Sequence, residues 1–237
     1  MQKNRLNILS TRPLNKQIID GAAKQNIFID CISFIETVPV VNNDLKEKIK
    51  KLSEEKITAL FTSMNAVEAV KGHLSKKPEW RIFSIGHTTK ELIDDFFGSK
   101  NIVATANDAN TLADVIIETG EKDIFFFCGD QRRDELPGKL RSKNIKLEEV
   151  VVYHTIKTTQ KISKEYDAVL FYSPSAVESF FSVNDINKNV TLFAIGNTTA
   201  DTIKEVVKNK IIIAEQPGKE ALVKKMMAHF SAEKQVN

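Results

Sequence analysis

Two short stretches of small polar residues have the composition of an anion-binding site, and each occurs twice in the chain. Ser63-Met64-Asn65-Ala66-Val67 returns 110 residues later as Ser173-Pro174-Ser175-Ala176-Val177, and Gly86-His87-Thr88 returns as Gly196-Asn197-Thr198. Each stretch follows an apolar run and begins an amphipathic pattern, which is typical of a turn from a strand into a helix. Unpaired N–H groups and the helix dipole favour an anion at such a turn. The candidate binding residues are Ser63, Asn65, Ala66, Gly86, Thr88, Ser173, Ser175, Ala176 and Gly196.

Serine, threonine and glycine also act as ordinary helix caps, so one such turn alone would indicate only local structure. Four turns, paired between two copies of a repeat, favour a ligand, because α/β proteins bind ligands at the carboxyl ends of their strands.

Arg12, in Thr11-Arg12-Pro13, follows the first apolar run and is a further candidate. Its guanidinium can bind a carboxylate with two N–H groups, although a surface arginine near a helix start is an equal alternative. The matching turn in the other copy, residues 128–135, carries mixed charges. For this turn we favour a salt-bridged loop over a binding site.

Tyr153 breaks the symmetry of the repeat. Val152-Tyr153-His154-Thr155-Ile156 lies 118 residues after Phe34-Ile35-Glu36-Thr37-Val38, so Ile35 occupies the position equivalent to Tyr153. A phenol can donate a proton or a hydrogen bond, but strand tyrosines are more often packing residues with one hydrated end. The four histidines form no triad pattern, and the chain has no Gly-x-Gly-x-x-Gly, P-loop or Gly-x-Ser-x-Gly motif, which disfavours nucleotide-dependent and hydrolase chemistry.

Composition describes an ordinary globular protein. The 237 residues are 42% hydrophobic and 27% charged, and the net charge of +3 gives no electrostatic case for a nucleic-acid partner. Cys31 and Cys128 lie in apolar runs, so we expect buried, inert thiols, and no Cys-x-x-Cys motif or histidine cluster suggests a metal. No apolar run is long enough to span a membrane. Because Met1 to Leu6 has no apolar signal core, the expected location is the cytoplasm.

The elements that position these residues alternate between strands and helices. Strands are expected near 6–10, 28–35, 57–61, 80–85, 101–105, 123–128, 146–154, 167–172, 190–195 and 210–214. Between them, apolar residues recur at helical spacing, and Asn110 or Thr111 is expected to cap the helix around Leu112. Alternation of this kind predicts an α/β fold of parallel sheets flanked by helices.

Repeat spacing leaves two domain partitions open. A plain tandem would divide the chain near residue 118. A permuted arrangement would make 40–155 one continuous domain and 1–36 plus 165–237 the other, with linkers near 36–40 and 155–163. In the second case two linkers cross between the domains, which would make a hinge with a cleft beside it.

The chain resembles the uroporphyrinogen-III synthase family of tetrapyrrole biosynthesis over nearly its whole length. Each motif is short, and their order and spacing carry the resemblance. The motifs are Thr11-Arg12-Pro13, Phe61-Thr62-Ser63-x-Asn65-Ala66-Val67, Ile85-Gly86-x-Thr88-Thr89, Val152-Tyr153-x-Thr155, Ser173-Pro174-Ser175-Ala176-Val177 and Ala194-Ile195-Gly196-x-Thr198-Thr199-Ala200.

The resemblance implies two similar α/β domains joined by a two-stranded linker, which favours the permuted partition. It implies an enzyme without cofactor or metal that closes the linear tetrapyrrole hydroxymethylbilane, a substrate with eight carboxylates, into a macrocycle. The reaction releases water and inverts ring D. Tyr153 matches the family's general acid, and Thr198 matches a threonine expected to hold carboxylates or the catalytic geometry.

The same resemblance implies a small-molecule substrate as the main partner, with neither nucleic acid nor membrane involved. We expect a monomer that contacts the preceding pathway enzyme at most transiently. A non-catalytic cytoplasmic two-domain binder or sensor of an anionic small molecule is the alternative. The asymmetric Tyr153 favours the enzyme.

Overall fold

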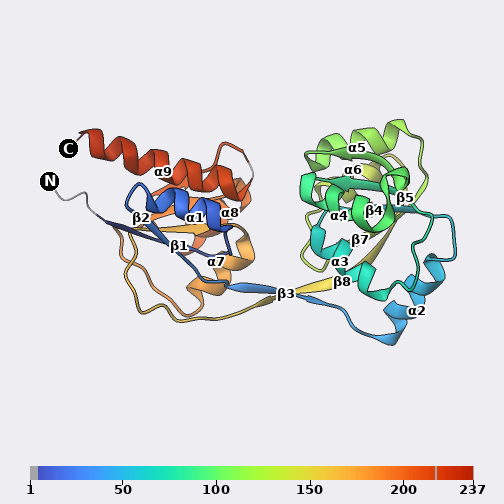
Figure 1. The fold of residues 1–237 in the computed structure, drawn as a ribbon, viewed down its shortest axis with the longest axis horizontal. Helices are drawn as coiled ribbons and strands as arrows, with labels where there is room; N and C mark the ends of the chain where they lie inside the picture. The colour runs from blue at the N-terminus through green and yellow to red at the C-terminus, as the bar shows by residue number, and fades with distance from the viewer. Residues whose placement is uncertain (1–4, 217, 237) are drawn as a thin grey trace. The chain divides into compact units, whose positions relative to one another are not determined.

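The chain forms two compact units in a computed structural model that describes residues 5–216 and 218–236, with side chains except at 87 and 233–236. Unit 1 comprises Met1–Glu36 and Ile156–Asn237, and unit 2 comprises Thr37–Thr155. Figure 1 shows the path of the chain, which leaves the first unit along one strand and returns along another. None of the helices within the described residues is long and apolar enough to cross a membrane.

Unit 1 is built on a sheet in which β11, β10, β9, β1 and β2 lie side by side in that order. Every neighbouring pair is parallel, so the carboxyl ends of these strands meet at one edge. The elements are β1 (Leu6–Ser10), α1 (Lys16–Ala23), β2 (Ile27–Cys31), β9 (Ala168–Phe171), α7 (Pro174–Phe181), β10 (Thr191–Ala194), α8 (Asn197–Val206), β11 (Ile211–Ile213) and α9 (Lys219–Val236).

Unit 2 has a second sheet, in the order β3, β8, β7, β4, β5, β6, and the pairs from β8 to β6 are parallel. Its strands are β3 (Ile35–Pro39), β4 (Thr58–Phe61), β5 (Arg81–Ile85), β6 (Ile102–Ala106), β7 (Asp123–Gly129) and β8 (Lys146–Lys157). Its helices are α2 (Asn43–Leu52), α3 (Met64–His73), α4 (His87–Phe97), α5 (Ala109–Glu118) and α6 (Glu135–Ser142), with a 3-10 turn at Ser99–Asn101.

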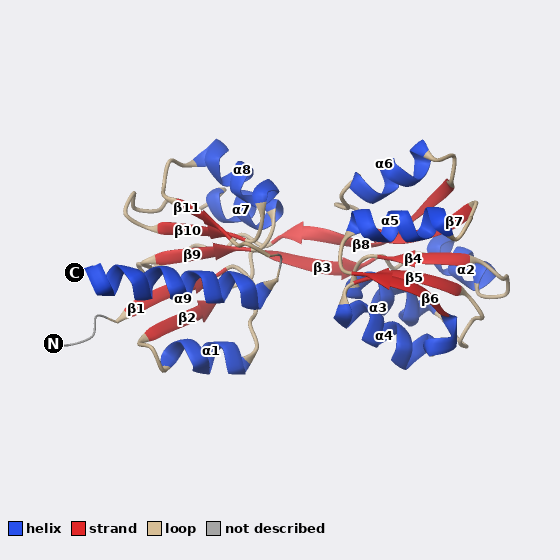
Figure 2. Ribbon diagram, turned by 90° about the horizontal axis from the view of Figure 1, so that it is seen from above, coloured by secondary structure: helices blue, strands red, loops and turns tan. Residues whose placement is uncertain are grey.

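Strands with two buried faces account for the layering of both units. In β4 the side chains alternate: Ala59 and Phe61 pack against α2, α3 and α4, whereas Leu60 packs against α5 and α6. Unit 1 repeats the arrangement, with α1 and α9 over one face and α7 and α8 over the other (Figure 2). These strands read as continuous apolar runs because neither face meets water.

The strand expected over 28–35 is two strands. β2 pairs with β1 in the first sheet, and after Cys31 the chain enters β3, which pairs with β8 in the second sheet. Phe34 lies at the break and is fully buried against the ring of Phe180, with 5.0 Å between the ring centroids. The apolar run therefore includes a buried residue of the connection between two strands. Periodicity alone cannot distinguish such a residue from one in a buried strand.

Two smaller expectations were wrong. Cys31 is exposed rather than buried, because it is the last residue of the edge strand β2; Cys128 is buried as expected. Helix α5 is capped by Asp108 rather than by Asn110 or Thr111, and the Asp108 carboxylate accepts from Thr111 N at 2.9 Å. Aspartate is as good a cap as asparagine, so the helix begins one residue before Asn110.

Candidate active site

Tyr153 lies in the C-terminal half of β8, beside the carboxyl end of β7. Its hydroxyl donates to the hydroxyl oxygen of Ser63, with 3.3 Å between the two atoms, and the side chain is half-buried. The contact brings together two residues that the sequence singled out separately. It leaves a phenol positioned at the carboxyl ends of parallel strands, where a proton donor can meet a ligand.

Ser63 joins β4 to α3 and holds the start of the helix. It is the N-cap, with φ −147° and ψ 137°, and its hydroxyl oxygen accepts from Asn65 N at 3.1 Å. Ala66 is fully buried beneath this turn, and the side chain of Asn65 is half-buried. The same hydroxyl thus caps a helix and contacts Tyr153, which fixes the helix N-terminus relative to the phenol.

Gly129, the last residue of β7, provides the space for the Tyr153 ring. A Cβ atom built on Gly129 would lie 2.5 Å from ring carbons of Tyr153 and 2.8 Å from its hydroxyl oxygen. Pairing between β7 and β8 shifts by one residue at this point, which sets Gly129 opposite Tyr153. A side chain at 129 would displace the phenol from its present position.

Asp130 holds the part of β8 that begins at Tyr153. Its backbone N–H donates to the carbonyl of Tyr153 at 3.2 Å. One carboxylate oxygen accepts from the N–H of Thr155 at 2.9 Å, and the other lies 3.1 Å from Nδ1 of His154. Because Asp130 contacts three consecutive residues from Tyr153 to Thr155, the backbone that carries the phenol has little freedom.

The second turn of unit 2 has a glycine that the backbone requires. Gly86 follows the last residue of β5 with φ 81°, a conformation that favours glycine, and it caps α4 without a side-chain bond. Thr88 is exposed in the first turn of α4. Since β4 and β5 are paired neighbours, this turn and the Ser63 turn occupy adjacent strand ends.

Unit 1 repeats both turns on the adjacent strands β9 and β10. The hydroxyl of Ser173 caps α7 by accepting from the N–H of Ala176 at 3.2 Å; Ala176 is buried and Ser175 is half-buried. Gly196 caps α8 in an extended conformation, with φ −177°. Thr198 is exposed in the first turn of α8, and its carbonyl accepts from the hydroxyl of Thr202 at 3.0 Å.

Arg12 follows β1 in unit 1 and has a cationic neighbour that the sequence did not reveal. The ammonium of Lys219, the first residue of α9, donates to the carbonyl of Pro13 at 3.1 Å. Partial burial of the ammonium and the nearby guanidinium of Arg12 lower the pKa of Lys219, although the side chain as a whole remains exposed. A signal was present: Lys219 faces Ala109 in the repeat, so the copies differ there.

Tyr172, beside Arg12, was also not singled out from the sequence. It follows β9 and is buried, and its hydroxyl lies 3.4 Å from that of Ser10. Burial raises the pKa of Tyr172 to about 12. The phenol is therefore protonated at neutral pH.

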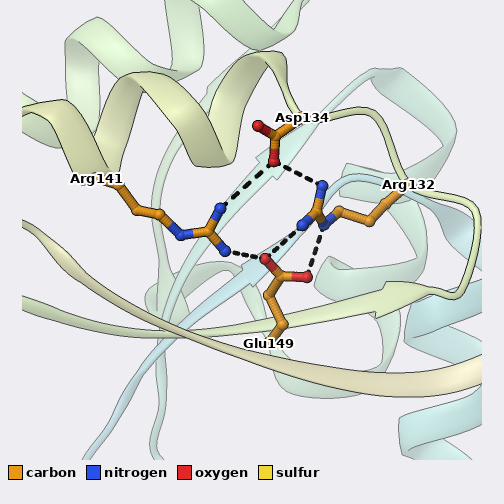
Figure 3. A network of polar contacts seen from close by, with 4 residues as sticks. All are labelled: Arg132, Asp134, Arg141 and Glu149. Atoms are coloured by element: carbon orange, nitrogen blue, oxygen red, sulfur yellow. Dashed lines mark hydrogen bonds and ion pairs between the residues drawn. The ribbon is translucent and has the colours of Figure 1, made fainter.

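The turn after β7 is a salt-bridged loop, as the sequence favoured. Arg132 makes two bonds to the carboxylate of Glu149, each 2.7 Å long, and one to Asp134 at 2.8 Å (Figure 3). Arg141 contacts the same two carboxylates. Hydrogen bonds from Arg132, and then from Arg141, hold the pKa of Glu149 below its usual range against the opposing effect of partial burial.

No metal-binding group is formed by the residues that the structure describes: none of their histidine, cysteine, aspartate and glutamate side chains gather in threes.

Comparison with known proteins shows which family the sequence matches. The family model described as uroporphyrinogen-III synthase HemD matches residues 22–224. A porphyrin biosynthesis protein HemD of Ruminiclostridium josui is 26% identical over 212 residues, which are 81% of this chain and 42% of that protein. The chain thus spans less than half of that relative. A uroporphyrinogen-III synthase of Saccharomyces cerevisiae is 23% identical over 84% of this chain and 79% of its own.

Solved structures show the same fold. The crystal structure of uroporphyrinogen-III synthetase from Helicobacter pylori superposes with a TM-score of 0.69 at 17% identity, covering 95% of this chain and 100% of that one. A mutant uroporphyrinogen III synthase from Thermus thermophilus gives a TM-score of 0.65 at 14% identity, with 97% and 99% covered. Because the family model spans most of the sequence, this chain belongs to the uroporphyrinogen-III synthase HemD family.

Proposed function

We propose that this protein is a uroporphyrinogen-III synthase, a lyase that converts hydroxymethylbilane into uroporphyrinogen III and water. Family membership supports the reaction class. The observation that carries the proposal is the Tyr153 phenol, which is hydrogen-bonded to Ser63 at the carboxyl ends of the strands and is given its space by Gly129.

In this proposal Tyr153 acts as a general acid. Its hydroxyl donates a proton to the terminal hydroxyl oxygen of the bilane, the carbon–oxygen bond breaks, and water leaves. The resulting cation is delocalised over the terminal pyrrole ring that carried the hydroxymethyl group, and the substituted carbon of ring D attacks it to form a spiro intermediate. Rearrangement of that intermediate inverts ring D and closes the macrocycle. The proton lost from the closing ring replaces the one that was donated, so the reaction as written consumes no co-reactant.

Most of the selectivity in this scheme comes from positioning. Hydroxymethylbilane loses its hydroxyl readily, and unassisted closure gives the isomer without inversion. The enzyme must therefore fold the chain so that the substituted end of ring D reacts. We assign the holding of substrate carboxylates to the strand-end turns of both units, including Thr198 at α8, Gly86 at α4 and Arg12 after β1.

Several finer points remain predictions. We propose that the compact units act as two domains, with β3 and β8 as the two connections. A cytoplasmic location, a monomeric state and transient contact with the preceding enzyme of the pathway are expected from the family resemblance.

The proposal is tested by following the loss of freshly generated hydroxymethylbilane with and without the protein. Catalysis predicts that the protein accelerates its disappearance in proportion to protein concentration. Equal rates in the two samples would contradict the enzyme and favour a binder built on the same fold.

A further inference from the structure

Arg12 follows β1 in unit 1, and Arg132 lies in the matching turn after β7 in unit 2. The two arginines differ in whether a carboxylate neutralises their charge. In unit 2, Arg132 is neutralised by Glu149 and Asp134 (Figure 3). In unit 1, Arg12 is half-buried, and its described polar contact is made by its backbone carbonyl, which accepts from the hydroxyl of Ser10 at 2.6 Å. Among the side chains that the structure describes, no carboxylate is bonded to Arg12.

Lys219 adds a second positive charge to the same corner. Its ammonium is bonded to the carbonyl of Pro13, the residue next to Arg12, at 3.1 Å. That bond uses one of three donors, so two remain for a ligand. In the described part of the chain the ammonium has no carboxylate partner either, whereas Lys225 on the same helix is paired with Glu215 at 2.5 Å.

Helix electrostatics make the position of Lys219 more unusual. It is the first residue of α9, a helix of 18 residues, and a helix N-terminus carries partial positive charge that disfavours a lysine. The first turn of α9 also holds Glu220, but in the described part of the chain no carboxylate is bonded to either cation. Two nearby cations and a positive helix end therefore meet without a bonded counter-charge. A local conflict of this kind is expected where a ligand supplies the missing partner.

From these contacts we infer that Arg12 and Lys219 together form a carboxylate-binding subsite of unit 1, and that Lys219 is a specificity-determining residue for a polycarboxylate substrate. The inference rests on the proposed function for the identity of the substrate, and on the geometry of unit 1 for the site. One substrate carboxylate binds between the guanidinium and the ammonium, with the first N–H groups of α9 nearby.

The first test compares the steady-state kinetics of Lys219→Gln and Lys224→Gln with those of the wild type. Lys224 is exposed on the same helix, so both variants lose one positive charge but only one loses the subsite. Lys219→Gln is expected to raise KM about three- to tenfold with little change in kcat, as for a partly solvated charge-assisted bond. Lys219→Arg should restore most of the loss, and Lys224→Gln should match the wild type.

A second test measures binding without turnover. Uroporphyrin III, which carries eight carboxylates and is fluorescent, is titrated with each variant and followed by anisotropy. The expected result is a Kd raised by a similar factor for Lys219→Gln and for Arg12→Gln. This factor should become smaller at higher salt concentration, because salt screens the charges. If Lys219→Gln has the Kd and the KM of the wild type, and the wild type is an active synthase, the subsite is overturned and the proposed function stands. A wild type that binds uroporphyrin III through Lys219 but forms no product would instead overturn the proposed function alone.

Discussion

At the scale of the residue, the proposed reaction depends on the hydroxyl of Tyr153 rather than on its ring. Tyr153→Phe keeps the ring beside Gly129 and removes the bond to Ser63. General acids contribute about 10²–10⁴-fold, and a readily lost hydroxyl places this case near the lower end. We therefore expect kcat to fall about a hundredfold, with residual activity.

The matched control is Tyr166→Phe, which removes a phenol bonded to Asp30 at 3.0 Å, before β9. It should leave turnover unchanged. Full activity in Tyr153→Phe would remove the assigned role of the phenol.

Gly129 is predicted to set the position of Tyr153. In Gly129→Ala the new methyl group would meet the ring at 2.5 Å, so the half-buried phenol must swing away from Ser63. We expect activity close to that of Tyr153→Phe and a stability loss of about 1–2 kcal/mol, as for modest overpacking. Gly72→Ala is the control, because nothing lies within 4 Å of a Cβ there. Turnover at the wild-type level in Gly129→Ala would show that the ring position does not matter.

The sequence identified residues whose signal is local, or which stand out when the two copies of the repeat are compared. Ser63 and Ser173 are recognisable caps, and Tyr153 differs from Ile35 in the other copy. Gly129 could not be identified as critical, because its role depends on a ring contributed from β8, 24 residues away in the sequence. Lys219 was missed because its partner, the Pro13 carbonyl, is 206 residues away.

At the scale of the element, the network around Glu149 joins β8 to the loop after β7 and to α6 (Figure 3). Its removal in Glu149→Gln should lower the free energy of unfolding at pH 7 by about 1–2 kcal/mol, measured by urea denaturation. The neighbouring Glu148→Gln is the control, because Glu148 forms an exposed pair with Lys48 at 2.8 Å and should change stability by less than about 0.5 kcal/mol.

The pH dependence of this effect has a definite sign. The pKa of Glu149 is lower in the folded state than in the unfolded chain, mainly through hydrogen bonds from Arg132. Its contribution is therefore present above the unfolded pKa of about 4.3 and is lost as the pH falls through the folded value. The difference between wild type and Glu149→Gln should shrink below about pH 4. A difference that stays constant into acid would contradict the assigned ion pairs.

Elements were predicted well where one periodicity covers one element. The buried strands β4, β7, β9 and β10 lie within the expected ranges or within one residue of them. The run over 28–35 failed because Phe34 is apolar for a different reason, as a core residue between strands in different sheets. Hydrophobicity cannot distinguish a residue in a buried strand from one that anchors a connection.

At the scale of the whole molecule, each unit has a core of its own. The hydrophobic clusters around Phe61 and Leu60 lie within unit 2, and those around Ile8 and Leu9 lie within unit 1. A fragment of residues 37–155 should therefore fold alone and unfold cooperatively on heating, as followed by circular dichroism. A fragment without a cooperative transition would show that the units depend on each other for stability.

The isomer composition of the product tests the proposed synthase activity directly. Wild-type protein is mixed with freshly generated hydroxymethylbilane, the porphyrinogens are oxidised, and the uroporphyrin isomers are separated and compared with a protein-free sample. For a uroporphyrinogen-III synthase, we expect mainly the type III isomer with protein and type I without it. Type I in both samples would contradict the synthase, because a chain that only binds the bilane has no means of inverting ring D.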